Sequence, residues 1–227
     1  MKRRAAVTGI VVAAGRSKRM GRLGDKTWIR ISDRPVLFYS LKAFRAAGIR
    51  RVVIVVRPGS VEGTRRRLRS FSPAKLPDLT VVAGGRQRQD SVWNGLEAVE
   101  TDTVLVHDAA RPAVSPDLIR RICRLAIRFG ACVPVVPVID TLKRVRGRRI
   151  IRTESREGLY GVQTPQGFQT KVLREAIREA RRRGKVVTDC SAAVELLGKP
   201  VMATPGDPAN IKLTYPEDLV RIRSVLK

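Results

Sequence analysis

The chain has 227 residues, with 46 Lys or Arg against 20 Asp or Glu, so its formal net charge at pH 7 is +26. Hydrophobic residues make up 43% and charged residues 29%, which excludes disordered, collagen-like and coiled-coil proteins and leaves apolar material for the core of one large α/β domain. The three cysteines include no close pair, which excludes a disulfide framework and a CxxC zinc site, and we assign them to packing. A single histidine, His107, excludes a His-rich metal site.

The positive charge favours an anionic partner, such as nucleic acid, acidic lipid or a phosphorylated small molecule. The basic residues are spread along the whole chain, so we interpret most of them as a solvated surface, including the arginine runs at 65–67 and 181–183. A nucleic-acid site requires aromatic residues among the cations, and neither run contains one. We therefore expect no specific nucleic-acid partner.

The amino terminus resembles a secretory signal peptide, because Lys2, Arg3 and Arg4 precede an apolar stretch. That stretch ends directly at Arg16, and cleavage there would remove the first expected strand. No segment approaches the ~18 consecutive apolar residues of a membrane span. The expectation is a cytoplasmic protein without a membrane partner.

Apolar runs rich in Val and Ile alternate with amphipathic stretches over the first part of the chain. The runs predict buried strands at residues 6–12, 52–56, 79–82, 103–107 and 132–136. The stretches predict helices near residues 36–47, 61–71, 90–99 and 115–128. Gly48 ends the first helix, and Ser115 caps the last, with Pro116 at its first position. This order predicts an α/β fold with a Rossmann-like, doubly wound and mostly parallel sheet.

The alternation stops at Pro137. Around Gly147, residues 140–168 alternate charged and apolar side chains, which predicts a protruding β-hairpin arm, at about 138–168, too polar to be a pair of core strands. Two helices, a strand and a closing helix are expected at residues 171–183, 190–197, 201–204 and from Pro216. Because no linker or repeat divides the chain, we expect a single domain over 1–227.

The connection after the first strand, residues 12–21, has features of a phosphate-binding loop. Ala13, Ala14 and Gly15 are small enough to let backbone N–H groups approach an anion at the strand's carboxyl end. It matches neither the Walker A nor the GxGxxG pattern. Four cations in or after the loop would neutralise a polyphosphate: Arg16, Lys18, Arg19 and Lys26. A basic surface turn is the alternative.

A second cluster, residues 107–112, ends the fourth expected strand, and ligands of open α/β sheets bind beyond such strand ends. Asp108 suits a Mg²⁺ ligand beside phosphates, and Arg111 suits a bidentate phosphate contact. The alternative is a salt bridge between Asp108 and Arg111. For His107 we favour a local hydrogen bond.

A third segment, Gly84 and Gly85, precedes a helix, and Ser91 or the helix N-terminus is a candidate contact for a base or a phosphate. A turn in which Asp90 caps the helix explains the segment equally well. Lys212, near the end of the chain, adds another cation.

Taken together, these segments and several later ones form an ordered set of motifs. They are AAG (13–15), RMG (19–21), Lys26, GGxxRxDSV (84–92), HDAARP (107–112), DTxK (140–143), TPQ (164–166), TD (188–189) and NIK (210–212). Their order and spacing over residues 8–219 resemble those of the 2-C-methyl-D-erythritol 4-phosphate cytidylyltransferases of the non-mevalonate isoprenoid pathway, which are nucleotidyltransferases.

The resemblance implies that CTP and 2-C-methyl-D-erythritol 4-phosphate give the CDP-linked alcohol and pyrophosphate, with Mg²⁺ as cofactor. It also implies a homodimer whose arm reaches the partner's active site. The implied nucleotide-binding residues are Ala13, Ala14, Gly15, Gly84, Gly85, Ser91 and Asp108, with Asp108 near the metal and the ribose. The implied catalytic cations are Arg19, Lys26 and Lys212. The implied sugar-phosphate contacts are Arg111, Thr188 and Lys212, with Thr141 and Arg156 from the other subunit.

Four residues depart from the family's usual pattern. Ser17, Asp25 and Thr27 stand where glycine, proline and glutamine are usual, and Cys190 stands where glutamate is usual. Asp25 puts a negative charge beside Lys26, so the departures bear on nucleotide affinity more than on the fold.

Two alternative functions follow. A ribitol-5-phosphate cytidylyltransferase shares the loop and the fold. A polyanion-binding or nucleic-acid-binding protein on this fold is motivated by the +26 charge and predicts binding that falls steeply with salt.

Overall fold

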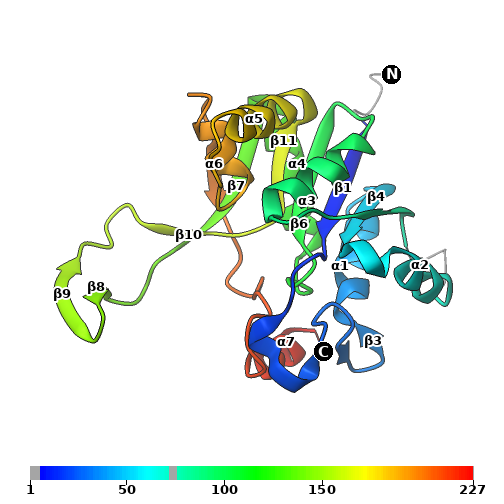
Figure 1. Cartoon of the computed structure of the whole chain (residues 1–227), viewed down its shortest axis with the longest axis horizontal. Coiled ribbons are helices and arrows are strands. Elements are labelled where there is room, and N and C mark those ends of the chain that lie inside the picture. Colours follow the sequence, from blue (N-terminus) through cyan, green and yellow to red (C-terminus); the bar gives the residue numbers. More distant parts are fainter. Residues whose placement is uncertain (1–5, 72–75, 227) are drawn as a thin grey trace.

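The structure, a computed structural model, describes residues 6–71 and 76–226, and its centre is an eight-stranded sheet with helices on both faces (Figure 1). The sheet order is β10-β7-β11-β6-β1-β4-β5, with β12 also paired to β7. The strands are β1 (Val7–Val12), β4 (Arg51–Val56), β5 (Asp78–Ala83), β6 (Thr103–Asp108), β7 (Ala131–Pro137), β10 (Tyr160–Val162), β11 (Gln166–Gln169) and β12 (Met202–Pro205). The predicted α/β fold with a mostly parallel sheet is confirmed.

Strand β1 lies at the point where the sheet changes direction. It pairs in parallel with β4 on one edge and with β6 on the other, and Ile10 lies level with Val53 and Val106. The chain runs outward from β1 through β4 to β5 and then returns to β6 on the opposite edge of β1. Such a switch point separates the loops at the strands' carboxyl ends and leaves a crevice between them.

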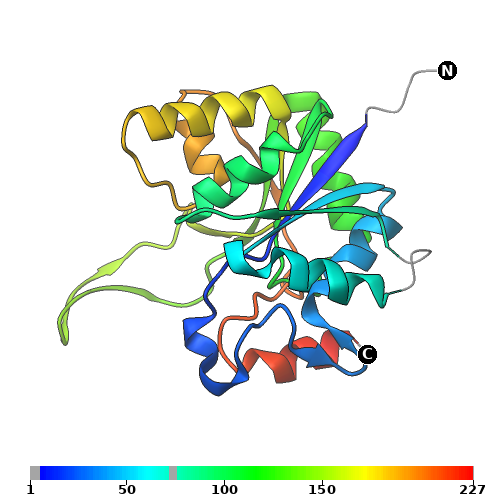
Figure 2. The ribbon, with the colours of Figure 1, turned by 45° about the vertical axis from the view of Figure 1, so that its right-hand side comes forward.

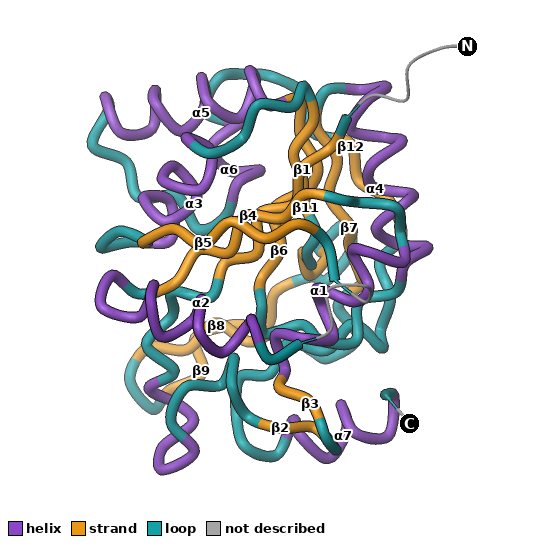
Figure 3. Tube along the Cα trace, turned by 90° about the vertical axis from the view of Figure 1, so that its right-hand side faces the viewer, coloured by secondary structure: helices purple, strands orange, loops and turns teal. Residues whose placement is uncertain are grey.

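Side chains of the central strands alternate between two cores, as strands buried on both faces require. On β4, Ile54 packs in one core and Val53 and Val55 in the other. The first core is covered by α1 (Val36–Ala46), α2 (Val61–Arg69) and α4 (Pro116–Phe129), and the second by α3 (Arg88–Glu97), α5 (Thr170–Arg182) and α6 (Cys190–Glu195). Figure 3 shows α1 and α4 on the side of the sheet opposite to α3, α5 and α6.

The start of α4 follows the sequence signal. Ser115 Oγ accepts a hydrogen bond from the Leu118 N–H at 3.2 Å, so the predicted cap of α4 is confirmed.

Within the described residues, every helix is too short or too polar to cross a membrane. The basic residues before Ala5, which resemble a signal peptide, lie outside the described residues.

Residues 160–169 do not belong to the arm, so the predicted arm boundary near 168 is wrong. Strand β11 runs antiparallel between β6 and β7 in the middle of the sheet, and Phe168 is fully buried. The sequence conceals this strand because it is short and its first two residues, Gln166 and Gly167, are polar or small. A Cβ at Gly167 would lie 2.8 Å from side-chain carbons of Ala126 and Ile122, so α4 packs directly on the strand's backbone.

The arm itself is the hairpin of β8 (Leu142–Arg146) and β9 (Arg149–Glu154), which extends away from the sheet (Figures 1 and 2). Gly147 has a φ of 60°, the left-handed conformation that a tight hairpin turn requires. Val145, Ile150 and Ile151 on the arm are 55%, 64% and 54% exposed. Exposed apolar side chains of this kind on an otherwise charged hairpin leave a surface that another molecule can bury.

A small lobe, which the sequence did not predict, lies beyond the carboxyl ends of the central strands (Figure 1). It contains a 3₁₀ helix (Lys18–Leu23), the hairpin β2 (Arg30–Ile31) and β3 (Arg34–Pro35), and α7 (Asp218–Val225). Met20, Leu213 and Ile222 are buried together in its core. The lobe therefore brings the first loop against a segment almost two hundred residues later: Lys26 Nζ donates to the carbonyl oxygen of Leu213 at 3.0 Å, across 187 positions.

His107 connects the end of β6 to the segment before β11. Its Nε2 lies 3.2 Å from the carbonyl oxygen of Arg111, and its Nδ1 lies 3.1 Å from the hydroxyl oxygen of Thr164. Since a carbonyl only accepts, a neutral ring protonated on Nε2 satisfies both contacts. The expected local hydrogen bond is confirmed, and burial lowers the pKa of His107 to about 4.

This burial predicts a pH dependence of stability. The unfolded chain binds a proton at His107 near the ordinary value of about 6.5, whereas the folded protein binds it near 4. The contribution of neutral, buried His107 to the free energy of unfolding is complete above the unfolded pKa. It is lost as pH falls from about 6.5 toward 4, so that the free energy of unfolding is lower by about 2 kcal/mol at pH 5. Urea unfolding at pH 7.5 and 5 measures it. His107→Gln should show a smaller difference between the two pH values, and an equal difference in both proteins would contradict the assignment.

Candidate active site

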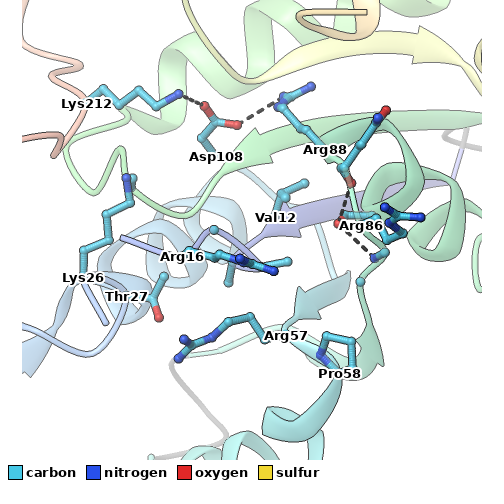
Figure 4. A pocket seen from close by; sticks show the side chains of 18 residues that line it. Val12, Arg16, Lys26, Thr27, Arg57, Pro58, Arg86, Arg88, Asp108 and Lys212 are labelled. Carbon is cyan, nitrogen blue, oxygen red and sulfur yellow. Dashed lines mark hydrogen bonds and ion pairs between the residues drawn. The ribbon is translucent and has the colours of Figure 1, made fainter. Parts of the chain in front are cut away.

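The carboxyl ends of β1, β4, β5 and β6 surround a cavity of about 720 Å³ (Figure 4). This is the crevice in which ligands of doubly wound sheets bind. The fold brings nine of the predicted site residues to its wall: Ala13, Ala14, Gly15, Lys26, Gly84, Gly85, Ser91, Asp108 and Lys212. Other lining residues were not chosen as site residues from the sequence, among them Thr27, Arg57, Arg86 and Arg88.

The three glycines that line the cavity, Gly15, Gly84 and Gly85, differ in how closely other protein atoms pack against them. A Cβ at Gly84 would lie 2.7 Å from Ser91 Oγ and 2.8 Å from Ala14 Cβ. A Cβ at Gly85 would lie 2.3 Å from Asp90 Cβ, so the start of α3 itself requires this glycine pair. At Gly15 a Cβ would meet no protein atom within 4 Å. Packing within the chain therefore does not explain Gly15, whereas a ligand in the cavity would.

Helix α3 begins with a capping box that shapes one side of the cavity. The Gln87 N–H donates to Asp90 Oδ2 at 3.1 Å, so Gln87 is the capping residue and the expectation of an Asp90 cap is wrong. Ser91 Oγ accepts from the Gly85 N–H at 3.2 Å and donates to the carbonyl oxygen of Gln87 at 3.1 Å. Ser91 thus holds the glycine turn in place.

Asp108 is the centre of charge in the cavity. One carboxylate oxygen accepts from Arg88 Nη2 at 3.1 Å and the other from Lys212 Nζ at 2.7 Å (Figure 4). Burial raises the pKa of Asp108, but the two cations outweigh it and hold this pKa well below the ordinary range. The alternative interpretation, a salt bridge between Asp108 and Arg111, is wrong, because Arg111 Nη1 donates instead to the carbonyl oxygen of Asn210 at 2.6 Å.

Arg88 has a second partner, which the packing interpretation of the cysteines did not include. Its Nη1 lies 3.6 Å from Cys190 Sγ, at the start of α6. Cys190 and Cys132 are buried, as packing predicts, and none of the three cysteines is in a disulfide. Cys190 therefore supports the guanidinium group that holds Asp108.

Lys26 lines the same cavity, on the same side as Lys212 (Figure 4). Its N–H donates to Ser17 Oγ at 3.3 Å and its Nζ to the carbonyl oxygen of Leu213 at 3.0 Å. Burial lowers the pKa of Lys26, and the neighbouring charges of Lys212 and Arg19 lower it further. Because cations repel one another here, an anion bound between them would be favoured.

Five predicted site residues do not line the cavity. Arg19 lies with its guanidinium carbon 5.4 Å from the centre of the Tyr215 ring, and Arg111 is directed at residue 210. Thr188 is exposed just before α6, and Thr141 and Arg156 are exposed at the base of the arm. Within one chain, the cavity therefore contains more of the residues predicted for the nucleotide than of those predicted for the sugar phosphate.

The donor set of the cavity fits a divalent cation only when phosphates are present. In the described parts of the chain, no three His, Cys, Asp or Glu side chains form a group that could hold a metal ion. Asp108 lines the cavity as a single carboxylate. Mg²⁺ is commonly held by one or two carboxylates together with substrate phosphates and water, and Asp108 suits that arrangement.

Comparisons with known proteins agree with the motifs. The family model IspD: 2-C-methyl-D-erythritol 4-phosphate cytidylyltransferase matches residues 7–227. The chain is 42% identical over 226 residues to the 2-C-methyl-D-erythritol 4-phosphate cytidylyltransferase of Pelotomaculum thermopropionicum, covering 97% of this chain and 94% of that protein. It is 41% identical over 222 residues to a bifunctional IspD/IspF enzyme of Solidesulfovibrio magneticus, covering 94% of this chain and 55% of that enzyme.

A solved structure gives the same result. The crystal structure of 2-C-methyl-D-erythritol 4-phosphate cytidylyltransferase from Thermus thermophilus is similar with a TM-score of 0.79 at 37% identity, covering 96% of this chain and 97% of that one. Sequence and fold thus agree with this family over nearly the whole chain. The chain belongs to the 2-C-methyl-D-erythritol 4-phosphate cytidylyltransferase family of nucleotidyltransferases.

Proposed function

We propose that this protein joins CTP and 2-C-methyl-D-erythritol 4-phosphate to give 4-CDP-2-C-methyl-D-erythritol and pyrophosphate. The observation that carries the proposal is the convergence of Lys26, Lys212 and Asp108 on one cavity at the switch point of the sheet, in a chain of this family. The relatives from Pelotomaculum thermopropionicum and Thermus thermophilus carry this acceptor in their names, which favours it over ribitol 5-phosphate.

The proposed reaction needs no nucleophile from the protein. An oxygen of the acceptor's phosphate attacks the α-phosphorus of CTP, a phosphorus–oxygen bond forms, and the bond to the β-phosphate breaks as pyrophosphate leaves. Catalysis is then positioning of the two phosphates and stabilisation of the charge on the five-coordinate phosphorus. Lys26 and Lys212 lie on the same side of the cavity and supply that stabilisation, and Arg19 supports the triphosphate from the adjoining loop.

We assign the nucleotide to the two small-residue loops. Ala13, Ala14 and Gly15 would contact the cytidine from β1, and the turn of Gly84 and Gly85 would contact it from β5. Ser91 contributes by fixing that turn through the Gly85 N–H at 3.2 Å. Open space beside Gly15 supports a close approach of the ligand.

We propose Mg²⁺ as the cofactor, held by Asp108 and by oxygens of the triphosphate. When bound, it would neutralise phosphate charge. Asp108 stays ionised because Arg88 and Lys212 hold its pKa well below the ordinary range, so its carboxylate is available as a ligand at neutral pH.

We further propose a homodimer in which the arm completes the partner's cavity. The exposed apolar residues Ile150 and Ile151 on β9 support an interface there. Thr141 and Arg156 would contact the acceptor phosphate from the other subunit, beside Arg111 and Thr188. This arrangement would supply the sugar-phosphate side that one chain leaves incomplete.

The first test is release of pyrophosphate with CTP, Mg²⁺ and 2-C-methyl-D-erythritol 4-phosphate. Lys26→Ala should lower the rate by about 10²-fold or more, because it removes a cation from the reacting phosphates. Lys42→Ala, an exposed lysine on α1, serves as the matched control and should leave the rate unchanged. Turnover with ribitol 5-phosphate alone would change the acceptor, and silence with both acceptors would refute the proposed reaction.

The lowered pKa of Lys26 predicts an alkaline limit to activity. A lysine with a lowered pKa loses its proton at a lower pH than usual, so kcat/KM for CTP should begin to fall at a pH below the ordinary lysine pKa of about 10.4. Lys26→Arg should fall less over the same range, because a guanidinium group stays protonated. An alkaline limb of the same position in both proteins would contradict the role of Lys26.

The dimer proposal predicts complementation between two inactive variants. Lys26→Ala disables the cavity of its own subunit, whereas Arg156→Ala disables the arm that serves the partner. Co-folding the two in equal amounts should restore about a quarter of wild-type activity, because half of the dimers then carry one intact site of two. Activity no higher than that of the two variants measured separately would exclude a contribution of the arm in trans.

A further inference from the structure

Asp25 is the centre of a hydrogen-bond set beside the cavity that the proposed reaction does not use. Its Oδ1 accepts from the Thr27 N–H at 3.1 Å and from the Thr27 hydroxyl at 2.7 Å. Its Oδ2 accepts from Arg57 Nη2 at 3.0 Å. Asp25 thus connects the turn that carries Lys26 to the residue that follows β4, 32 positions away.

The two ends of this connection differ in rigidity. Arg57 directly follows β4, which is paired in parallel with β1 on one edge and β5 on the other. The segment around Lys26 is an irregular loop with no strand partner of its own. Because a paired central strand fixes the backbone before Arg57, the ion pair fixes the position of the loop relative to the sheet.

One member of the pair, Arg57, belongs to the cavity wall. Arg57 and Thr27 both line the cavity, and Figure 4 shows them on the side below Arg16. The Arg57 and Asp25 side chains are 43% and 21% exposed. An isolated pair of this exposure contributes little to stability, so the arrangement is better explained by geometry at the cavity than by folding.

Lys26 is held on its other sides as well. Its N–H donates to Ser17 Oγ, and Ser17 adopts the left-handed φ of 52°. Ser17, Asp25 and Thr27 are three of the positions at which the loop departs from the family's usual residues. In this chain the three departures form hydrogen bonds on both sides of Lys26, instead of acting separately.

We propose that Asp25 and Arg57 form a positioning pair for Lys26. The ion pair holds the turn of Asp25 and Thr27 so that the Lys26 ammonium group faces the triphosphate, and it neutralises the carboxylate next to that lysine. Neither residue is a catalytic residue. The inference depends on the proposed function for the identity of the nucleotide, and on the observed contacts for the pair itself.

A double-mutant cycle tests the pair. Asp25→Asn keeps an acceptor for Thr27 but removes the charge, and Arg57→Ala removes the partner. Each single variant should bind CTP about tenfold more weakly, as measured by calorimetry with Mg²⁺, and should show a kcat/KM for CTP about tenfold lower. The double variant should bind CTP no more weakly than either single variant. Independent effects would multiply to about a hundredfold.

Two controls separate positioning from general effects. Arg57→Lys keeps a cation within reach of Asp25 and should recover most of the affinity. Arg66→Ala removes the same charge from an exposed position on α2 and should leave affinity unchanged. Thermal melting checks folding, and Arg57→Gln replaces Arg57→Ala in the cycle if the latter does not fold.

The outcomes are distinguishable from failure of the proposed function. Multiplicative losses, or CTP binding that is undiminished in both single variants, would overturn the pair. Wild-type protein that binds CTP but releases no pyrophosphate with the acceptor would overturn the proposed function, and the calorimetric cycle would still decide on the pair.

Discussion

The buried carboxylate of Asp108 imposes the constraint on which the site depends. A charge at the buried end of a central strand requires compensation, and breaking such a pair typically costs about 3–5 kcal/mol. Here the compensation comes from Arg88, 20 positions before Asp108, and from Lys212, 104 positions after it. The start of α3 and the segment before α7 are therefore fixed relative to β6 by one side chain. The cavity between them follows from this arrangement.

Burial of apolar side chains explains which parts of the fold could be predicted from the sequence. Long apolar runs such as β4 and β6 predicted their strands, because burial on both faces leaves a continuous signal in the sequence. Strand β11 left no such signal. Gly167 is needed for the contact with α4, and Gln166 is a polar residue whose Nε2 donates to Asp189 Oδ2 at 2.7 Å. The β2–β3 hairpin is too short to leave a pattern. Motifs placed Asp108 and Lys26 at the cavity, but the partners of Asp108 and the contact with Arg57 depend on long-range folding.

Some of the arginines that give the chain its +26 charge contact other side chains of the protein and are not only solvated. The sequence places no aromatic residue within either arginine run. In the fold, however, the guanidinium carbon of Arg67 lies 4.9 Å from the centre of the Trp28 ring, and that of Arg181 lies 5.3 Å from the centre of the Trp93 ring. Arg182 and Arg183 both pair with Glu179. Cation–π and ion-pair contacts of this kind stabilise surface helices modestly and occupy aromatic faces on which a nucleic-acid base would otherwise stack.

The contact between Lys26 and Leu213 has a consequence for synthesis of the chain. Domains acquire structure from the amino terminus as the chain leaves the ribosome, and β1, β4 and β5 pair early in that order. The lobe that holds Lys26 remains incomplete until residues 210–213 have emerged, and until then Asp108 lacks one of its two cations. A nascent chain can therefore contain most of the sheet and still be unable to form the nucleotide cavity, so that folding of the sheet and acquisition of the site are separate events in time.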